Sequence, residues 1–218
     1  MDTQSSNEDT GALPGWRRWL QWLQEDVAGS VAVTYSRVTV MVVDASPSMD
    51  NHDFPPTRLG AARAAALTAV RRLATEDPHA AVALVAFWGR ARCACGLTPV
   101  TTLEPFETAL AGLHSDNATN ITAALQVTRD LLKGVSAPVI QVILLSDGES
   151  NTGGPPDRLA QQVRDRAILE CIGIAGTPTD LNAELLKRIA SRHPDGTPRY
   201  RWIGDRAQLE AHYHRLAG

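Results

Sequence analysis

Three polar segments of the sequence contain oxygen-bearing side chains that could together bind a hard metal ion. The first is Asp44-Ala45-Ser46-Pro47-Ser48, a D-x-S-x-S pattern in which a carboxylate precedes two hydroxyls. The second contains Thr119, and the third contains Asp147 within Ser146-Asp147-Gly148-Glu149. Mg²⁺ prefers oxygen ligands in near-octahedral geometry and gives up its waters reluctantly. The predicted metal ligands are therefore Asp44, Ser46, Ser48, Thr119 and Asp147.

The spacing and the types of these side chains indicate how such a site would behave. Two hydroxyls two residues apart on a tight loop, as at Ser46 and Ser48, can both point at one centre. Because only two of the five predicted ligands are acidic, a bound cation would keep much of its positive charge and an exchangeable position. Mg²⁺ is the expected metal, and the residues do not distinguish it from Mn²⁺ or Ca²⁺.

The elements that must position these side chains follow from the hydrophobic pattern. Short apolar, β-branched runs typical of buried parallel strands alternate with helical patterns. The expected strands are residues 37–44, 80–88, 139–147 and 168–175, with weaker ones at 92–100 and 199–203. The expected helices are 58–74, 102–113, 119–133, 156–167, 181–192 and 206–217. This alternation predicts a doubly wound α/β fold with a mostly parallel open sheet, one short antiparallel edge strand and helices on both faces.

The predicted ligands follow the ends of predicted strands, which is where α/β sheets bind ligands. Asp44 ends the first strand, and Asp147 ends the strand at 139–147. In open α/β sheets, ligands bind at the carboxyl ends of the strands, near the point where the strand order reverses. Each of these residues taken alone is an ordinary turn or cap residue, since Ser and Asp favour turns and Thr119 could cap a helix. The metal site is therefore predicted from the set and its order.

Three parts of the chain are expected. Residues 1–14 are polar and predicted to be a disordered tail. Residues 15–36 hold an amphipathic helix rich in Trp, followed by a linker, and residues 37–218 form the α/β domain. The Trp16–Trp22 helix would pack on the domain, dock a partner or lie at a membrane surface; Glu25 and Asp26 on its polar face make the last reading the weakest.

Composition excludes several classes of protein. Hydrophobic residues make up 44% and charged residues 21% of the 218, which is typical of a globular chain and not of a disordered or collagenous one. A net charge of −3 gives no overall attraction to nucleic acid. No apolar run approaches the roughly 20 residues that span a bilayer, and the first ten residues lack the pattern of a secretory signal. A cytoplasmic location is expected.

The three cysteines are too few for a disulfide framework and are predicted to serve the core. Cys93 and Cys95 form a C-x-C pair on the expected edge strand, where both would point to one face. Without a second pair or a suitably spaced His, a soft-metal or redox role for them is the weaker interpretation. Cys171 lies within an apolar strand and is predicted to be buried.

The ordered set of five ligands resembles a known family. The chain resembles a von Willebrand factor A domain over residues 37–218, and its D-x-S-x-S motif, Thr119 and Asp147 look like the family's metal-ion-dependent adhesion site. The segments ECIGIAGTPTDLNAELLKRIA and RYRWIGDRAQLEAHY look like the family's later strands and helices. Pro47 departs from the usual Gly, and Pro fixes φ near −65°, so this loop is expected to be stiffer.

The resemblance implies a non-enzymatic module whose bound metal accepts an Asp or Glu carboxylate from a partner protein. It further implies a subunit of a cytoplasmic system with an AAA+ ATPase, or with kinase and phosphatase partners. The loops at 50–54, 115–118 and 149–154 would form the exposed rim of the site. His52 is a solvated loop residue, an additional metal ligand or a contact of the partner, and the first is the main expectation.

Two other functions remain open. One is a metal-independent assembly subunit that docks through the Trp helix. The other is a phosphotransfer or phosphatase enzyme that uses Asp44, as haloacid-dehalogenase-like hydrolases use a strand-end Asp. Such enzymes need a second Asp two residues later, where this chain has Ser46.

Overall fold

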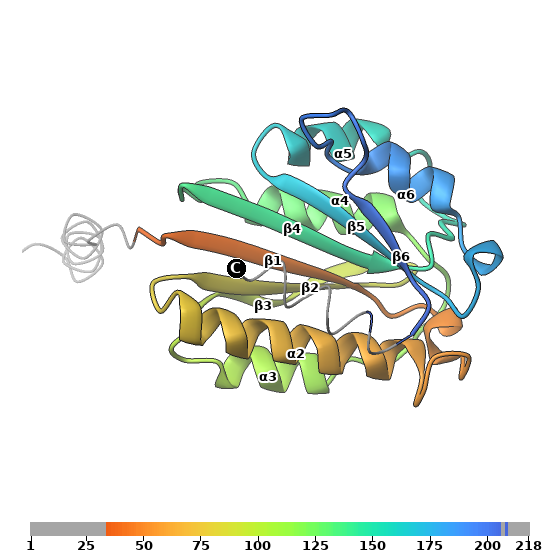
Figure 1. Ribbon diagram of the computed structural model, residues 1–218, viewed down its shortest axis with the longest axis horizontal. Helices are drawn as coiled ribbons and strands as arrows, with labels where there is room; N and C mark the ends of the chain where they lie inside the picture. The colour runs from red at the N-terminus through yellow and green to blue at the C-terminus, as the bar shows by residue number, and fades with distance from the viewer. Residues whose placement is uncertain (1–33, 206–207, 209–218) are drawn as a thin grey trace, which may run out of the picture. The chain divides into compact units, whose positions relative to one another are not determined.

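The computed structural model describes residues 34–205 and 208, which form a six-stranded sheet with helices on both faces (Figure 1). The strands are β1 Arg37–Asp44, β2 Ala81–Phe87, β3 Ala91–Pro99, β4 Val139–Ser146, β5 Ile168–Ile174 and β6 Tyr200–Ile203. The helices are α2 Arg58–Glu76, α3 Glu104–Ala111, α4 Ile121–Leu131, α5 Asp157–Arg164 and α6 Ala183–Ile189, with short 3₁₀ turns η1 Pro47–Asp50 and η2 Pro178–Asp180.

The strand order β3-β2-β1-β4-β5-β6 places β1 in the middle of the sheet. All neighbouring pairs are parallel except β2 and β3, so β3 is an antiparallel edge strand. The predicted fold class is therefore confirmed. The chain moves from β1 outward to β2 and β3 and then returns to β4 on the other side of β1. This reversal puts the ligand-binding crevice of the fold at the carboxyl ends of β1 and β4.

Side-chain alternation in the central strands fills two core layers. On β1, Met41 and Val43 pack towards α2 and α3, whereas Val40 and Val42 pack towards the face that α4, α5 and α6 cover. Figure 1 shows these two groups of helices on opposite faces of the sheet. The strands are buried on both faces, which explains their continuous apolar sequences.

The longest of the described helices, α2, begins at a well-formed cap. The Thr57 hydroxyl accepts a hydrogen bond from the Gly60 amide at 2.9 Å, and the helix ends at Glu76, two residues before Pro78. Alanines supply most of the buried face of α2, and their small side chains let the helix lie close to the sheet. Arg58, the first residue of α2, is buried at the carboxyl end of the sheet, next to the predicted metal site.

Several local expectations are corrected. Cys93 is exposed, contrary to the predicted core position, whereas Cys95 and Cys171 are buried. The pairing of β3 with β2 shifts register on both sides of Leu84, so Cys93 and Cys95 do not share a regular strand face. Phe54, expected on an exposed rim, is fully buried. The described helices α3, α4, α5 and α6 are shorter than predicted at their ends, whereas α2 runs two residues further, to Glu76. Local pattern is least informative at helix ends.

The predicted tail at 1–14, the Trp-rich helix and most of the last helix lie outside the described residues. Within residues 34–205 and 208, none of the helices combines the length and apolar character needed to cross a bilayer.

The packing of β4 gives a direct test of the fold. Leu144 is fully buried between β1 and β5, so Leu144→Ala should lower the free energy of unfolding by about 2–5 kcal/mol through lost burial and a residual cavity. Val139→Ala at the exposed start of the same strand should cost less than about 1 kcal/mol. Urea denaturation of both variants measures the difference, and equal losses would contradict the described layers.

Candidate functional site

The D-x-S-x-S loop leaves β1 and turns at once into η1, which brings its polar groups together. The Asp44 carboxylate accepts a hydrogen bond from the Ser46 amide at 2.9 Å, and this contact closes the turn. The Ser46 and Ser48 hydroxyl oxygens lie 3.1 Å apart. Two of the predicted ligands therefore stand side by side, as their spacing suggested, and Pro47 begins the 3₁₀ turn between them.

Asp44 lies in the interior of the protein. Its side chain is fully buried, and its second oxygen accepts a hydrogen bond of 2.5 Å from the Ser146 hydroxyl at the end of β4. Burial, together with the negative charge of Asp147, raises the pKa of Asp44 to about 7 despite these hydrogen bonds. The carboxylate form of Asp44 is thus electrostatically unfavourable here unless positive charge is supplied.

Asp147 follows β4 directly and is also buried. One oxygen accepts a hydrogen bond from the Glu149 amide at 3.2 Å, and its main-chain carbonyl accepts one from Asn182 at 2.9 Å. Gly148 makes this turn feasible because its φ is +78° and an added Cβ would lie 2.8 Å from the Asn182 carbonyl oxygen. The Ser-Asp-Gly sequence thus fixes the position of Asp147 against the start of α6.

Thr119 is buried just before α4, on a loop tied to the segment after β4. The amide of Thr119 donates to the Asn151 side chain at 2.9 Å, and the Thr119 carbonyl accepts from the amides of Asn151 and Thr152. Asn120 is the residue that caps α4, by accepting from the Ala123 amide at 2.8 Å. The cap interpretation of Thr119 is therefore wrong. Within the described chain, no hydrogen bond joins the Thr119 hydroxyl to the other four predicted ligands.

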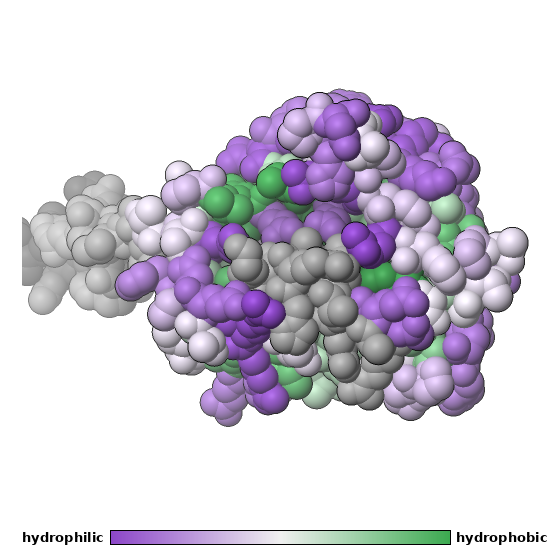
Figure 2. Space-filling view, viewed as in Figure 1, coloured by the Kyte–Doolittle hydropathy of each residue, from purple (hydrophilic) through white to green (hydrophobic). Residues whose placement is uncertain are grey.

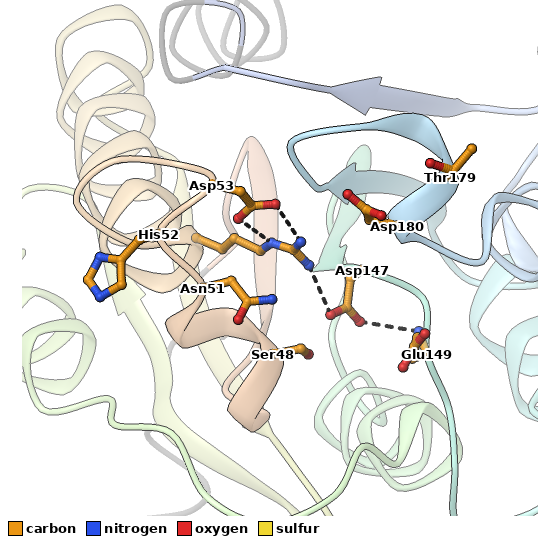
Figure 3. A pocket seen from close by; sticks show the side chains of 9 residues that line it. Ser48, Asn51, His52, Asp53, Asp147, Glu149, Thr179 and Asp180 are labelled. Atoms are coloured by element: carbon orange, nitrogen blue, oxygen red, sulfur yellow. Dashed lines mark hydrogen bonds and ion pairs between the residues drawn. The ribbon is translucent and has the colours of Figure 1, made fainter.

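An arginine that the sequence analysis did not single out neutralises part of this site. Nε and Nη2 of Arg58 donate to the two oxygens of Asp53 at 2.9 and 2.5 Å, and Nη1 lies 3.4 Å from an Asp147 oxygen (Figure 3). Asp53 also accepts from the Gly176 amide at 2.8 Å. Burial alone would lower the pKa of Arg58, but the hydrogen bonds and charge of Asp53, with the charge of Asp147, raise it. Arg58 is therefore a permanent cation beside Asp147.

A cavity of about 670 Å³ opens over these groups. Its lining includes two predicted ligands, Ser48 and Asp147, while Asp44, Ser46 and Thr119 are buried and do not line it. The acidic side chains of Glu149 and Asp180 also face it. Figure 3 shows Ser48 on the side of Asp147, whereas the His52 ring points away. The His52 ring bonds to the Pro56 carbonyl oxygen at 2.6 Å, so nothing in this geometry makes it a metal ligand.

The chemistry of these side chains fits a hard divalent cation. When all three carboxyls are ionised, Asp44, Asp53 and Asp147 carry three negative charges and Arg58 carries one positive charge, which leaves two negative charges among these four side chains. Residues 34–205 and 208 contain no cluster of three or more His, Cys, Asp or Glu side chains placed to bind a metal. The predicted set does not require such a cluster, because three of its five ligands are hydroxyls. Asp44 and Asp147 would supply negatively charged ligands to the cation. The three hydroxyl groups, of Ser46, Ser48 and Thr119, would supply neutral oxygen ligands.

Comparisons with known proteins agree with this architecture. The family model for the von Willebrand factor type A domain matches residues 39–149. The chain therefore belongs to the von Willebrand factor A family, as the resemblance of its motifs predicted. The matched residues run from β1 to just past the Ser-Asp-Gly turn, so they include all five predicted ligands. No curated protein matches the sequence.

Solved structures share the fold at low sequence identity. A von Willebrand factor type A protein from Catenulispora acidiphila superposes with a TM-score of 0.68 and 22% identity, over 84% of this chain and 42% of that one. The von Willebrand domain of the type V pili tip protein Mfa5 from Porphyromonas gingivalis superposes with a TM-score of 0.69 and 15% identity, over 85% of this chain and 95% of that one. The SpRpn10 VWA domain superposes with a TM-score of 0.65 and 16% identity, over 83% of this chain and 94% of that one.

The raised pKa of Asp44 predicts how stability depends on pH when no metal is bound. The ordinary pKa is 3.8, so between about pH 4 and 7 the folded state holds a proton that the unfolded chain has released. The free energy of unfolding should therefore fall as pH rises through this range, by at most about 1.4 kcal/mol per pH unit from this group, and level off above pH 7.

Asp44→Asn should remove this part of the pH dependence, because the amide does not titrate. Urea unfolding of wild type and variant in EDTA at pH 5, 6, 7 and 8 measures it. Parallel curves for the two proteins would show that Asp44 does not hold the extra proton.

Proposed function

We propose that this chain is a non-enzymatic, metal-dependent protein-interaction module. In this proposal Asp44, Ser46, Ser48, Thr119 and Asp147 hold Mg²⁺, and the metal accepts a carboxylate from an Asp or Glu of a partner protein. The observation that carries the proposal is the pair of buried carboxylates, Asp44 and Asp147, at the point where the strand order reverses. Two hydroxyls lie side by side on the same loop, and the protein's own positive charge there is too small to balance the two carboxylates. A divalent cation would supply that charge and lower the pKa of Asp44.

The residues around the site support binding of a partner more than catalysis. Asp44 is fully buried and accepts hydrogen bonds at both oxygens, so it is poorly placed to attack a phosphate ester. Ser48 and Asp147 line the open cavity, through which a side chain of a partner would approach them. We expect the partner to be a component of a cytoplasmic system with an AAA+ ATPase or with kinase and phosphatase proteins. The alternative assembly role through the Trp16–Trp22 helix concerns residues outside the described part of the chain.

Metal-dependent capture of a partner tests the proposal. Tagged wild-type protein should retain a specific partner from lysate in Mg²⁺ and lose it in EDTA. Asp147→Ala should lose the partner in both buffers, because it removes one of two acidic ligands. Asp165→Ala, an exposed carboxylate on the α5–β5 connection, should behave as wild type.

Calorimetry of the purified proteins with MgCl₂ separates loss of metal from loss of partner. We expect wild type and Asp165→Ala to bind one Mg²⁺ and Asp147→Ala to bind at least tenfold more weakly, a difference of about 1.4 kcal/mol. Wild type that binds no divalent cation, or a partner retained equally under all conditions, would overturn the proposal.

Arg58 and Asp53 should tune metal affinity in opposite directions. Arg58→Gln removes a cation 3.4 Å from Asp147, so it should tighten Mg²⁺ binding, by about tenfold. Asp53→Asn removes the acidic partner that holds Arg58, so Arg58 should pair more fully with Asp147 and weaken Mg²⁺ binding by a similar factor.

Arg72→Gln, elsewhere on α2, is the matched control for the first substitution and should leave affinity unchanged. Mg²⁺ titrations by calorimetry distinguish the two possible roles of the Arg58–Asp53 pair. A purely structural role predicts weaker binding in both variants, so a loss of affinity in Arg58→Gln would rule out the electrostatic account.

A further inference from the structure

A second surface lies at the opposite end of the sheet, where β4 and β5 begin. Val139 and Ile168, the first residues of these strands, are each 38% exposed and are the exposed large hydrophobic side chains among residues 34–205 and 208. Ile168 pairs with Gln141, two residues after Val139, so both side chains project from the same face of the sheet. Figure 2 shows hydrophobic atoms here among hydrophilic ones. The two side chains line a cavity of about 520 Å³.

Arginines frame this cavity, and no acidic residue lines it. They are Arg164, Arg166, Arg192 and Arg199. None of the four forms an ion pair within the described residues, whereas other surface arginines of the chain, Arg71, Arg72, Arg129 and Arg188, each pair with a carboxylate. A cluster of unpaired positive charge creates a local positive potential that attracts anionic groups, even in a chain of net charge −3.

In the described part of the chain, the acidic residues near this cluster form no ion pair with its four arginines. The charge of Arg164 acts on Asp157, but Asp157 forms its ion pair with Arg188. The Asp165 carboxylate accepts a hydrogen bond from the Gln161 side chain at 2.6 Å. The Asp195 carboxylate accepts from the amide and hydroxyl of Thr197 at 2.9 and 2.6 Å. Both carboxylates are thus engaged within their own turns, and neither lines the cavity.

Main-chain carbonyls hold three of the arginines in place. Arg164 donates to the Ile189 carbonyl at 2.5 Å, Arg166 to the Val135 carbonyl at 3.4 Å and Arg192 to the Gly196 carbonyl at 2.7 Å. A guanidinium group has five N–H donors, so each retains donors for a carboxylate. Because these side chains are already partly ordered, binding an anion would cost less conformational entropy than ordering free arginines.

We propose that this arginine-framed cavity is a second docking surface, for an acidic peptide segment of a partner protein that places an aliphatic side chain between its carboxylates. The carboxylates would pair with the guanidinium groups, and the aliphatic side chain would cover Val139 and Ile168. This surface lies at the amino ends of the strands, and the predicted metal ligands lie at their carboxyl ends. Its binding is therefore independent of metal and of the function proposed above.

The test uses the full chain in EDTA and a fluorescein-labelled peptide in which pairs of glutamates alternate with single leucines. Fluorescence anisotropy should show saturable binding that weakens as salt increases. Arg166→Glu and Arg192→Glu, at exposed positions, should each weaken binding at least tenfold. Arg90→Glu makes the same charge change after the carboxyl end of β2 and should bind as wild type. Circular dichroism melting curves establish that all variants are folded.

Two further probes test the chemistry of the partner. A peptide with serine in place of leucine should bind more weakly, because it cannot cover the aliphatic pair. A fluorescein-labelled oligothymidylate of equal charge should bind more weakly than the leucine peptide. The proposal is overturned if wild type does not bind the peptide, if both arginine variants bind as wild type does, if serine substitution has no effect, or if the oligonucleotide binds more tightly.

Discussion

Two carboxylates buried at one end of the sheet are the constraint around which this structure is arranged. Parallel pairing of β1 with β4 brings Asp44 and Asp147 to the same end of the sheet, where both are buried. Charges of like sign in such a place raise the free energy of the folded state unless hydrogen bonds or cations compensate. The Ser46 amide, the Ser146 hydroxyl and Arg58 each provide part of that compensation, and these groups come from three different segments of the chain.

The direction of the helices also helps to compensate the negative charge of the two carboxylates. In a sheet of parallel strands with helical crossovers, helices begin at the end where strands finish, so α2 and α4 place their partly positive amino termini on the side of the carboxylates. Arg58 at the first position of α2 works against that preference, since a cation is unfavourable at a helix amino terminus. Its bonds to Asp53 and its proximity to Asp147 offset this cost, which ties the start of α2 to both acidic residues.

The fold was predictable because it depends on regular patterns. Continuous apolar strands alternating with amphipathic helices specify a buried parallel sheet, and the ligand candidates were found because they stand where such strands end. Arg58 was not found, because in the sequence it is one more arginine in a helical segment, and only tertiary packing brings it to Asp147. Cys93 was misplaced because β3 shifts register twice, and regular alternation fails at such shifts. Whether the five predicted ligands bind a metal remains a prediction.

The two edges of the sheet limit how this domain can meet other proteins. As the described residues form it, one edge is β3, whose register shifts distort its hydrogen-bonding groups, and the other is β6, which has only four residues. Straight, long edges invite extended segments to add as a further strand, and irregular or short ones discourage it. A partner therefore finds few main-chain groups with which to form an added strand, so it must recognise the side chains of this domain. Small changes in loop sequence could then redirect the domain to a new partner without altering its sheet.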